Sequence, residues 1–106
     1  MTLYQILTDE STGVGIPVAY SHFTDKNKPS APPYLVYLGS GQDTFQADNT
    51  HYWKQNTYQL EYYFTVKNEA LEDRIEGILL DNGLLYDKSE DVFIESEGVF
   101  VIYYSI

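Results

Sequence analysis

The side chains best suited to bind a metal ion or to move a proton near neutral pH are two histidines, and they stand far apart in the chain. His22 and His51 are separated by 29 positions, and neither belongs to a close-spaced ligand pattern. Asp48 lies near His51, but one neighbouring carboxylate is common. Residues 87–91 read DKSED and lack the spaced acids and central glycine of a calcium loop. We expect no metal site.

Glycine and serine patterns give no stronger indication of chemistry. Residues 13–15 and 39–41 each begin like the phosphate-binding pattern G-x-G-x-x-G, but Val18 and Thr44 replace the third glycine. No serine stands in a G-x-S-x-G sequence, and the chain has no cysteine that could act as a nucleophile. We therefore expect turn glycines, no catalytic residues, no bound cofactor and no enzyme activity.

The size and charge of the chain limit its class and its partners. Its 106 residues predict a single domain, 1–106, with a core that needs no disulfide. Sixteen acidic residues oppose six basic ones, for a net charge of −10, which disfavours gripping of nucleic acid. Two interpretations of this acidity stay open: solubility alone, or a surface that DNA passes without sticking. No apolar run approaches the roughly 20 residues that span a bilayer, and the first nine residues do not resemble a signal peptide. We expect synthesis in the cytoplasm and no membrane contact.

The second half of the chain carries the clearest structural pattern. Residues 58–66 alternate with a period of two and predict a strand with Leu60, Tyr62 and Phe64 on one face. Asn68 as N-cap and Gly83 as stop bound a predicted amphipathic helix, 69–82. Residues 91–95 and 99–104 predict a hairpin that turns at 97–98.

The first half is less regular and supplies shorter elements. We expect the following order: a helix over 3–10 with Thr2 as N-cap, an edge strand at 16–20, a loop over 21–33, a buried strand at 34–38, and a polar stretch over 39–56 that forms a loop or an extended hairpin. The predicted fold class is α+β, with a mostly antiparallel sheet of four or five strands and two helices packed on it.

Tyrosine accounts for 11 of the 17 aromatic residues. Two adjacent pairs, 62–63 and 103–104, place a tyrosine on each face of their strands. Because tyrosine joins apolar area to a polar tip, it suits half-buried strands and protein contacts. We expect both faces of the sheet to be covered, by the chain's own helices or by a neighbouring subunit.

Six segments, in their order and spacing, resemble a known group of proteins. They are IPVAYSHF (16–23), PPYLVY (32–37), FQADNTHY (45–52), YQLEYY (58–63), IESEGVF (94–100) and IYY (102–104). Together they cover nearly the whole chain and look like the tail terminator, or tail-completion (neck), proteins of long-tailed bacteriophages and of prophages of Gram-positive bacteria.

This resemblance implies a structural virion protein without a cofactor. Such proteins form a ring, commonly hexameric, that caps the head-proximal end of the tail tube and joins the tail to the head. The implied partners are further copies of the chain, the tail tube protein and a head-side connector or stopper protein, with DNA only as passing cargo. The implied location is the tail or neck of the virion, assembled in the host cytoplasm.

A closed ring needs a contact between unlike surfaces of neighbouring subunits. The candidate subunit contacts are four aromatic residues: Phe45, Tyr52, Trp53 and Tyr63. An alternative is that the three aromatics of the polar stretch fold back onto their own core. Asp43 and Asp48 are candidates for an acidic lumen.

Two alternatives to the terminator hypothesis stay open. One is another virion part, namely a head–tail joining or stopper protein of the neck or a minor tail protein. The other belongs to a different class, a small acidic protein that binds and inhibits a host protein.

Overall fold

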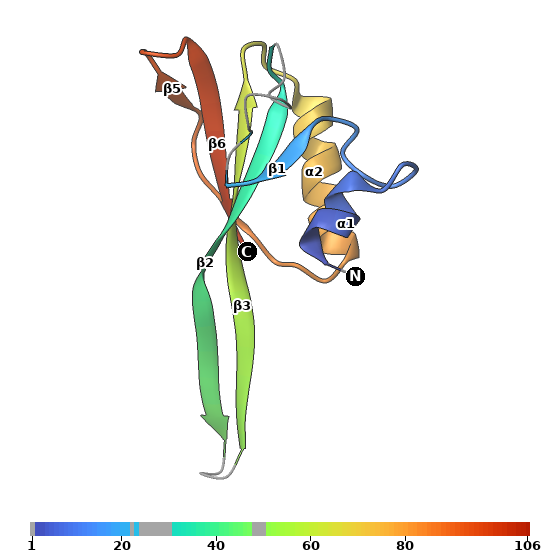
Figure 1. The fold of residues 1–106 in the computed structure, drawn as a ribbon, viewed down its shortest axis with the longest axis vertical. Coiled ribbons are helices and arrows are strands. Elements are labelled where there is room, and N and C mark those ends of the chain that lie inside the picture. The colour runs from blue at the N-terminus through green and yellow to red at the C-terminus, as the bar shows by residue number, and fades with distance from the viewer. Residues whose placement is uncertain (1, 22, 24–30, 48–50) are drawn as a thin grey trace.

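A computed structural model describes residues 2–21, 23, 31–47 and 51–106, and for residues 40–47 and 51–56 it describes the backbone alone. The elements follow the order α1 (Leu3–Thr8), β1 (Val18–Tyr20), β2 (Tyr34–Ala47), β3 (His51–Phe64), α2 (Glu69–Asp81), β4 (Asp87–Lys88), β5 (Val92–Ile94) and β6 (Val99–Ser105) (Figure 1). Neither of these helices is long and apolar enough to cross a bilayer.

The sheet is mixed and has six strands among the described residues. Its order is β1-β2-β3-β6-β4, and β5 also pairs with β6. β1 runs parallel to β2, whereas the other pairings are antiparallel. The α+β class is confirmed, but the predicted count of four or five strands is wrong. The additional strand is β4, whose two residues bear no apolar alternation and pair with Tyr104 and Ser105.

Helix α2 follows from local signals. The Asn68 side chain accepts a hydrogen bond from the Leu71 backbone N–H at 3.1 Å, which caps the first turn. Ile75 and Leu79 are fully buried against the sheet. The helix ends at Asp81, one residue before the predicted end, and Gly83 follows with a left-handed φ of +74°.

The core lies between one face of the sheet and the two helices, which Figure 1 shows on the same side of the strands. The alternation predicted for 58–66 is confirmed for Leu60, Tyr62 and Phe64, which are buried in this core. Val66 lies beyond the end of β3 and is 77% exposed. Thr2 caps α1, as predicted, although that helix ends at Thr8.

The opposite face of the sheet carries no helix within the described ranges. It is formed by the residues that alternate with the core positions, such as Val36 of β2, Glu61 and Tyr63 of β3, and Val101 and Tyr103 of β6. Val36 and Val101 are buried, while Glu61, Tyr63 and Tyr103 are half-buried. Among the described residues, helices therefore cover only one of the two faces, and the cover of the other face by a neighbouring subunit stays a prediction.

Candidate functional site

Strands β2 and β3 continue beyond the rest of the sheet as a two-stranded arm, which we define as residues 42–47 and 51–56. The arm is held by direct pairing from Gln42 opposite Asn56 to Ala47 opposite His51. β1 pairs with β2 only as far as Tyr37, and β6 pairs with β3 only from Gln59 onward. Figure 1 shows the arm extending away from both helices and the other strands. No third strand pairs with the arm in the part of the chain that is described.

An irregularity in register marks the root of the arm. Gly39 pairs with Tyr58 and Gly41 pairs with Thr57. Between these two pairs β2 therefore has one residue more than β3. A β-bulge of this kind bends a strand and increases its twist. The root is also fixed from the other side, because Tyr58 and Ile106 exchange backbone hydrogen bonds at 3.0 and 2.9 Å. The arm thus leaves the body at a defined position.

Three of the four predicted contact residues lie on the arm. Phe45 stands directly opposite Trp53, and Tyr52 stands opposite Gln46. Asp43, predicted to face a lumen, also lies on the arm, opposite Gln55. Asp48 lies outside the described residues. The backbone therefore gathers Phe45, Tyr52, Trp53 and Asp43 on one projecting element.

Tyr63 is not part of the arm and lies in the body of the sheet, on the face without helices. Its ring stacks on Tyr34 with a centroid separation of 5.0 Å and an interplanar angle of 26°. Its hydroxyl donates a hydrogen bond to Glu61 Oε1 at 2.7 Å. Burial and this hydrogen bond raise the pKa of Tyr63 well above its usual range, so the hydroxyl stays a donor. Tyr63 and the arm aromatics therefore form two separate candidate surfaces.

A cluster of charged side chains connects α2 to β4 and β6. The Glu72 carboxylate is 3% exposed and lies between two lysines, with Lys67 Nζ 2.8 Å from Oε2 and Lys88 Nζ 3.0 Å from Oε1. Although Oε2 lacks a partner with hydrogen-bond geometry among the described residues, the short distance to Lys67 makes this a direct ion pair. Lys67 also pairs with Asp91 at 3.0 Å. The buried charge is thus neutralised on both sides.

Glu76, one turn further along α2, is held by three donors. Lys88 Nζ lies 2.9 Å from Oε2, and the hydroxyls of Tyr104 and Tyr86 donate to the carboxylate at 2.9 and 3.0 Å. Burial favours the neutral acid, but the hydrogen bonds from Lys88, Tyr104 and Tyr86 outweigh it and lower the pKa of Glu76. The cluster ties α2 to β4 and β6, so its evident role is to fix the helix on the sheet.

The sequence analysis did not predict the burial of Glu72, which stands in the first turn of α2, where an exposed acid is common. The available signal was its spacing, because Glu72, Ile75 and Leu79 follow at i, i+3 and i+7 on one face of α2. An acid inside an apolar stripe needs a cation nearby. The position of Lys88 on β4 was not predictable without that strand.

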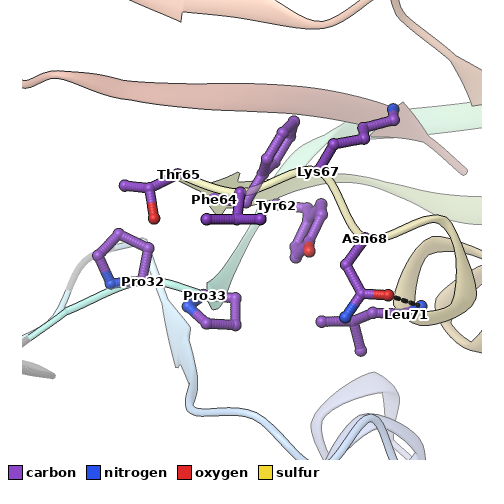
Figure 2. A pocket seen from close by; sticks show the side chains of 9 residues that line it. Pro32, Pro33, Tyr62, Phe64, Thr65, Lys67, Asn68 and Leu71 are labelled. Atoms are coloured by element: carbon purple, nitrogen blue, oxygen red, sulfur yellow. Dashed lines mark hydrogen bonds between the residues drawn. The ribbon is translucent and has the colours of Figure 1, made fainter.

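A shallow groove of about 280 Å³ opens beside the end of β3. Figure 2 shows Tyr62 and Phe64 from β3, Pro32 and Pro33 from the segment before β2, and Leu71 from α2 around it. The Tyr62 hydroxyl is buried and has no hydrogen-bond partner among the described residues. Residues 24–30, which shortly precede Pro32 and Pro33 in the chain, lie outside the described residues. We assign no ligand to this groove.

In a comparison with known proteins, no family model and no curated protein matches the chain.

Proposed function

We propose that this protein is a structural subunit that assembles into a ring through its arm, and that the ring caps the head-proximal end of a phage tail tube. The observation that carries the proposal is the arm itself, a six-residue pair of strands that extends from the body and pairs with no third strand among the described residues. The resemblance to tail terminators supplies the ring and the tail tube.

The physical support comes from the behaviour of isolated strand pairs. A two-stranded ribbon is marginally stable alone in water, and its two outer edges present unpaired N–H and C=O groups to any neighbouring chain. The arm also carries Phe45, Tyr52 and Trp53, and aromatic residues are enriched at the centres of protein interfaces. An arm on one subunit and a body surface on the next form a contact of unlike surfaces, which closes into a ring when the rotation fits.

The charge of the chain agrees with passage of DNA rather than with binding to it. Each subunit brings a net charge of −10, so a ring concentrates negative potential around its opening. We propose that Asp43 and Asp48 contribute to the lining of this opening. DNA would pass as cargo, and the protein partners would be the tail tube protein and a head-side connector or stopper protein.

The test is to mix the purified protein with tail tubes of the same phage or prophage and to locate it by electron microscopy. The expected result is density at one end of each tube. The matched control replaces residues 42–56 with the two-residue turn Asn-Gly, which keeps the register of Gly41 and Thr57. This control is expected to leave the tubes bare.

Two other outcomes would favour the alternatives. Rings that form but leave both tube ends bare would favour a neck protein on the head side. A protein that stays monomeric at every accessible concentration would favour the small acidic inhibitor and overturn the ring.

A further inference from the structure

Each strand of the arm has one edge that faces away from its partner strand. The direction of the backbone groups along β3 follows from the root of the arm, where Tyr58 and Ile106 exchange hydrogen bonds, so that the N–H and C=O of Tyr58 point away from β2. Because the backbone groups of successive residues in a strand point to alternate sides, the same holds for every second residue beyond Tyr58. The outer edge of β3 along the arm is therefore formed by the backbone groups of Tyr52, Lys54 and Asn56.

The outer edge of β2 follows from the pairing of the two strands. In an antiparallel pair, residues that stand opposite each other point their backbone groups either toward one another or both away. Gln42, Thr44 and Gln46 stand opposite the three residues that form the β3 edge. Their N–H and C=O groups therefore point out on the other side of the arm. The arm thus has two unlike edges, each with alternating backbone donors and acceptors.

Neither edge has the features that commonly prevent a further strand from pairing. Proteins block exposed strand edges with proline, with charged residues or with a bulge. The described residues of the arm include no proline, and Asp43 and Lys54 are the charged ones among them. The register shift lies at the root, between Gly39 and Gly41, and the pairing beyond it is regular. The edges of the arm can therefore accept a further strand.

Chain lengths indicate that this further strand comes from another molecule. Residues 24–30 are held at both ends near the start of β2, where the Phe23 ring contacts Tyr34 and Ala31 shortly precedes the strand. Seven residues held in this way extend at most about 14 Å from their ends, at roughly 3.5 Å per residue. Thr44 lies ten residues along β2 from Tyr34, or roughly 30 Å. Within the described residues no strand pairs with the arm either, so its edges are open to a second chain.

We propose that neighbouring arms pair through these edges, with the β2 edge of one subunit against the β3 edge of the next. This inference rests on the proposed ring and adds a backbone contact between arms to the contact of the arm with the body. Because the two edges are unlike, the pairing continues from subunit to subunit and closes with the ring. Each arm is then paired on both sides, which removes the open edges that leave a two-stranded ribbon marginally stable. Backbone hydrogen bonds also carry no net charge, which suits subunits that each bear a net charge of −10.

The test replaces one outward residue on each edge by proline, which removes an outward N–H and leaves the hydrogen bonds between the two strands of the arm in place. Thr44→Pro alters the β2 edge, and Lys54→Pro alters the β3 edge. The matched control is the alanine variant at the same position, which also loses the side chain but keeps the N–H. In sedimentation velocity, each proline variant is expected to associate at least about tenfold more weakly than its alanine counterpart, because a carbonyl of the neighbouring arm loses its donor.

A mixture of the two proline variants tests which edges meet. Thr44→Pro keeps its β3 edge and Lys54→Pro keeps its β2 edge, so the one arm pairing that stays intact joins a copy of each. At a concentration at which each variant alone is monomeric, the mixture is expected to form a dimer that contains one copy of each variant. A mixture that stays monomeric would overturn the pairing of unlike edges.

Circular dichroism melting establishes that each variant is folded. Should one of them unfold, Gln42→Pro and Asn56→Pro, at the outward positions nearest the root, take their place. Equal association of folded proline and alanine variants would also overturn the pairing of the arms. Loss of association on removal of the arm, combined with that result, would retain the proposed ring and reject only this contact. A protein that never associates would overturn both.

Discussion

Helix α2 and the arm are both connected to β3, but they differ in how many contacts they make with the rest of the chain. α2 buries Ile75 and Leu79 in the core and neutralises Glu72 and Glu76 with lysines of its own chain. The arm pairs its two strands with each other and, within the described residues, with no other element. Within the described residues the body makes its contacts inside one chain, whereas the outer edges of the arm are unpaired and, under the proposed function, contact another subunit. Stability and assembly should accordingly be separable by mutation.

The largest expected effect is the removal of the arm. Replacing residues 42–56 with Asn-Gly should abolish self-association while changing the melting temperature by less than about 5 °C, because the backbone of the arm extends away from the helices and the other strands (Figure 1). Sedimentation velocity and circular dichroism measure the two quantities on one sample. A body that unfolds without the arm would show that the two regions are not independent.

Glu72 tests the opposite side of the comparison. Glu72→Ala removes the shared buried partner of Lys67 and Lys88, which are 44% and 34% exposed and keep Asp91 and Glu76, and we expect a loss of about 1–2 kcal/mol in the free energy of unfolding. Urea denaturation measures this change. Glu10→Ala, at an exposed position, is the control and should change stability by less than about 0.5 kcal/mol. A loss below 1 kcal/mol for Glu72→Ala would mean that the cluster does not fix α2.

Two fully buried tyrosines give a finer comparison within the body. The Tyr104 hydroxyl donates to Glu76 at 2.9 Å, whereas the Tyr62 hydroxyl has no partner among the described residues. Tyr104→Phe should therefore cost about 1–2 kcal/mol, and Tyr62→Phe should be neutral or stabilising by up to about 1 kcal/mol. Equal losses in urea denaturation for both variants would indicate that Tyr62 has a partner as well.

The smallest expected effect is on the pH dependence of stability. The pKa of Glu76 is lowered in the folded protein from an ordinary value of 4.5, so the unfolded chain binds its proton more readily. The stability that Glu76 contributes is present above about pH 4.5 and is lost as the pH falls through its folded pKa. Glu76→Gln should therefore reduce the slope of unfolding free energy against pH below that value. An unchanged slope would assign the acid sensitivity to other carboxylates.

Local signals made much of the body predictable. Asn68, the apolar spacing of α2 and Gly83 define that helix without reference to the rest of the fold. The alternation around Leu60 and Tyr62 likewise identifies the core face of β3. These features depend on residues within one or two turns of each other, which is the range that a sequence pattern covers.

The features that escaped prediction depend on distant partners. β4 is a strand only because β6 lies beside it, and of the two lysines that neutralise the buried Glu72, Lys88 is brought there by β4. The polar stretch over 39–56 lacks a continuous apolar alternation, so the sequence left both a loop and an extended hairpin open. The structure has the hairpin, because pairing between the two strands replaces contact with a core.

The position of the single tryptophan has a practical consequence for optical measurements. Trp53 lies on the arm, opposite Phe45, while the body contains tyrosines and phenylalanines. Selective excitation of indole therefore gives fluorescence from the arm alone, so Trp53 is an intrinsic probe of that element. A shift in indole emission on addition of a second component would report arm engagement in real time, while the far-ultraviolet signal of the body stays constant.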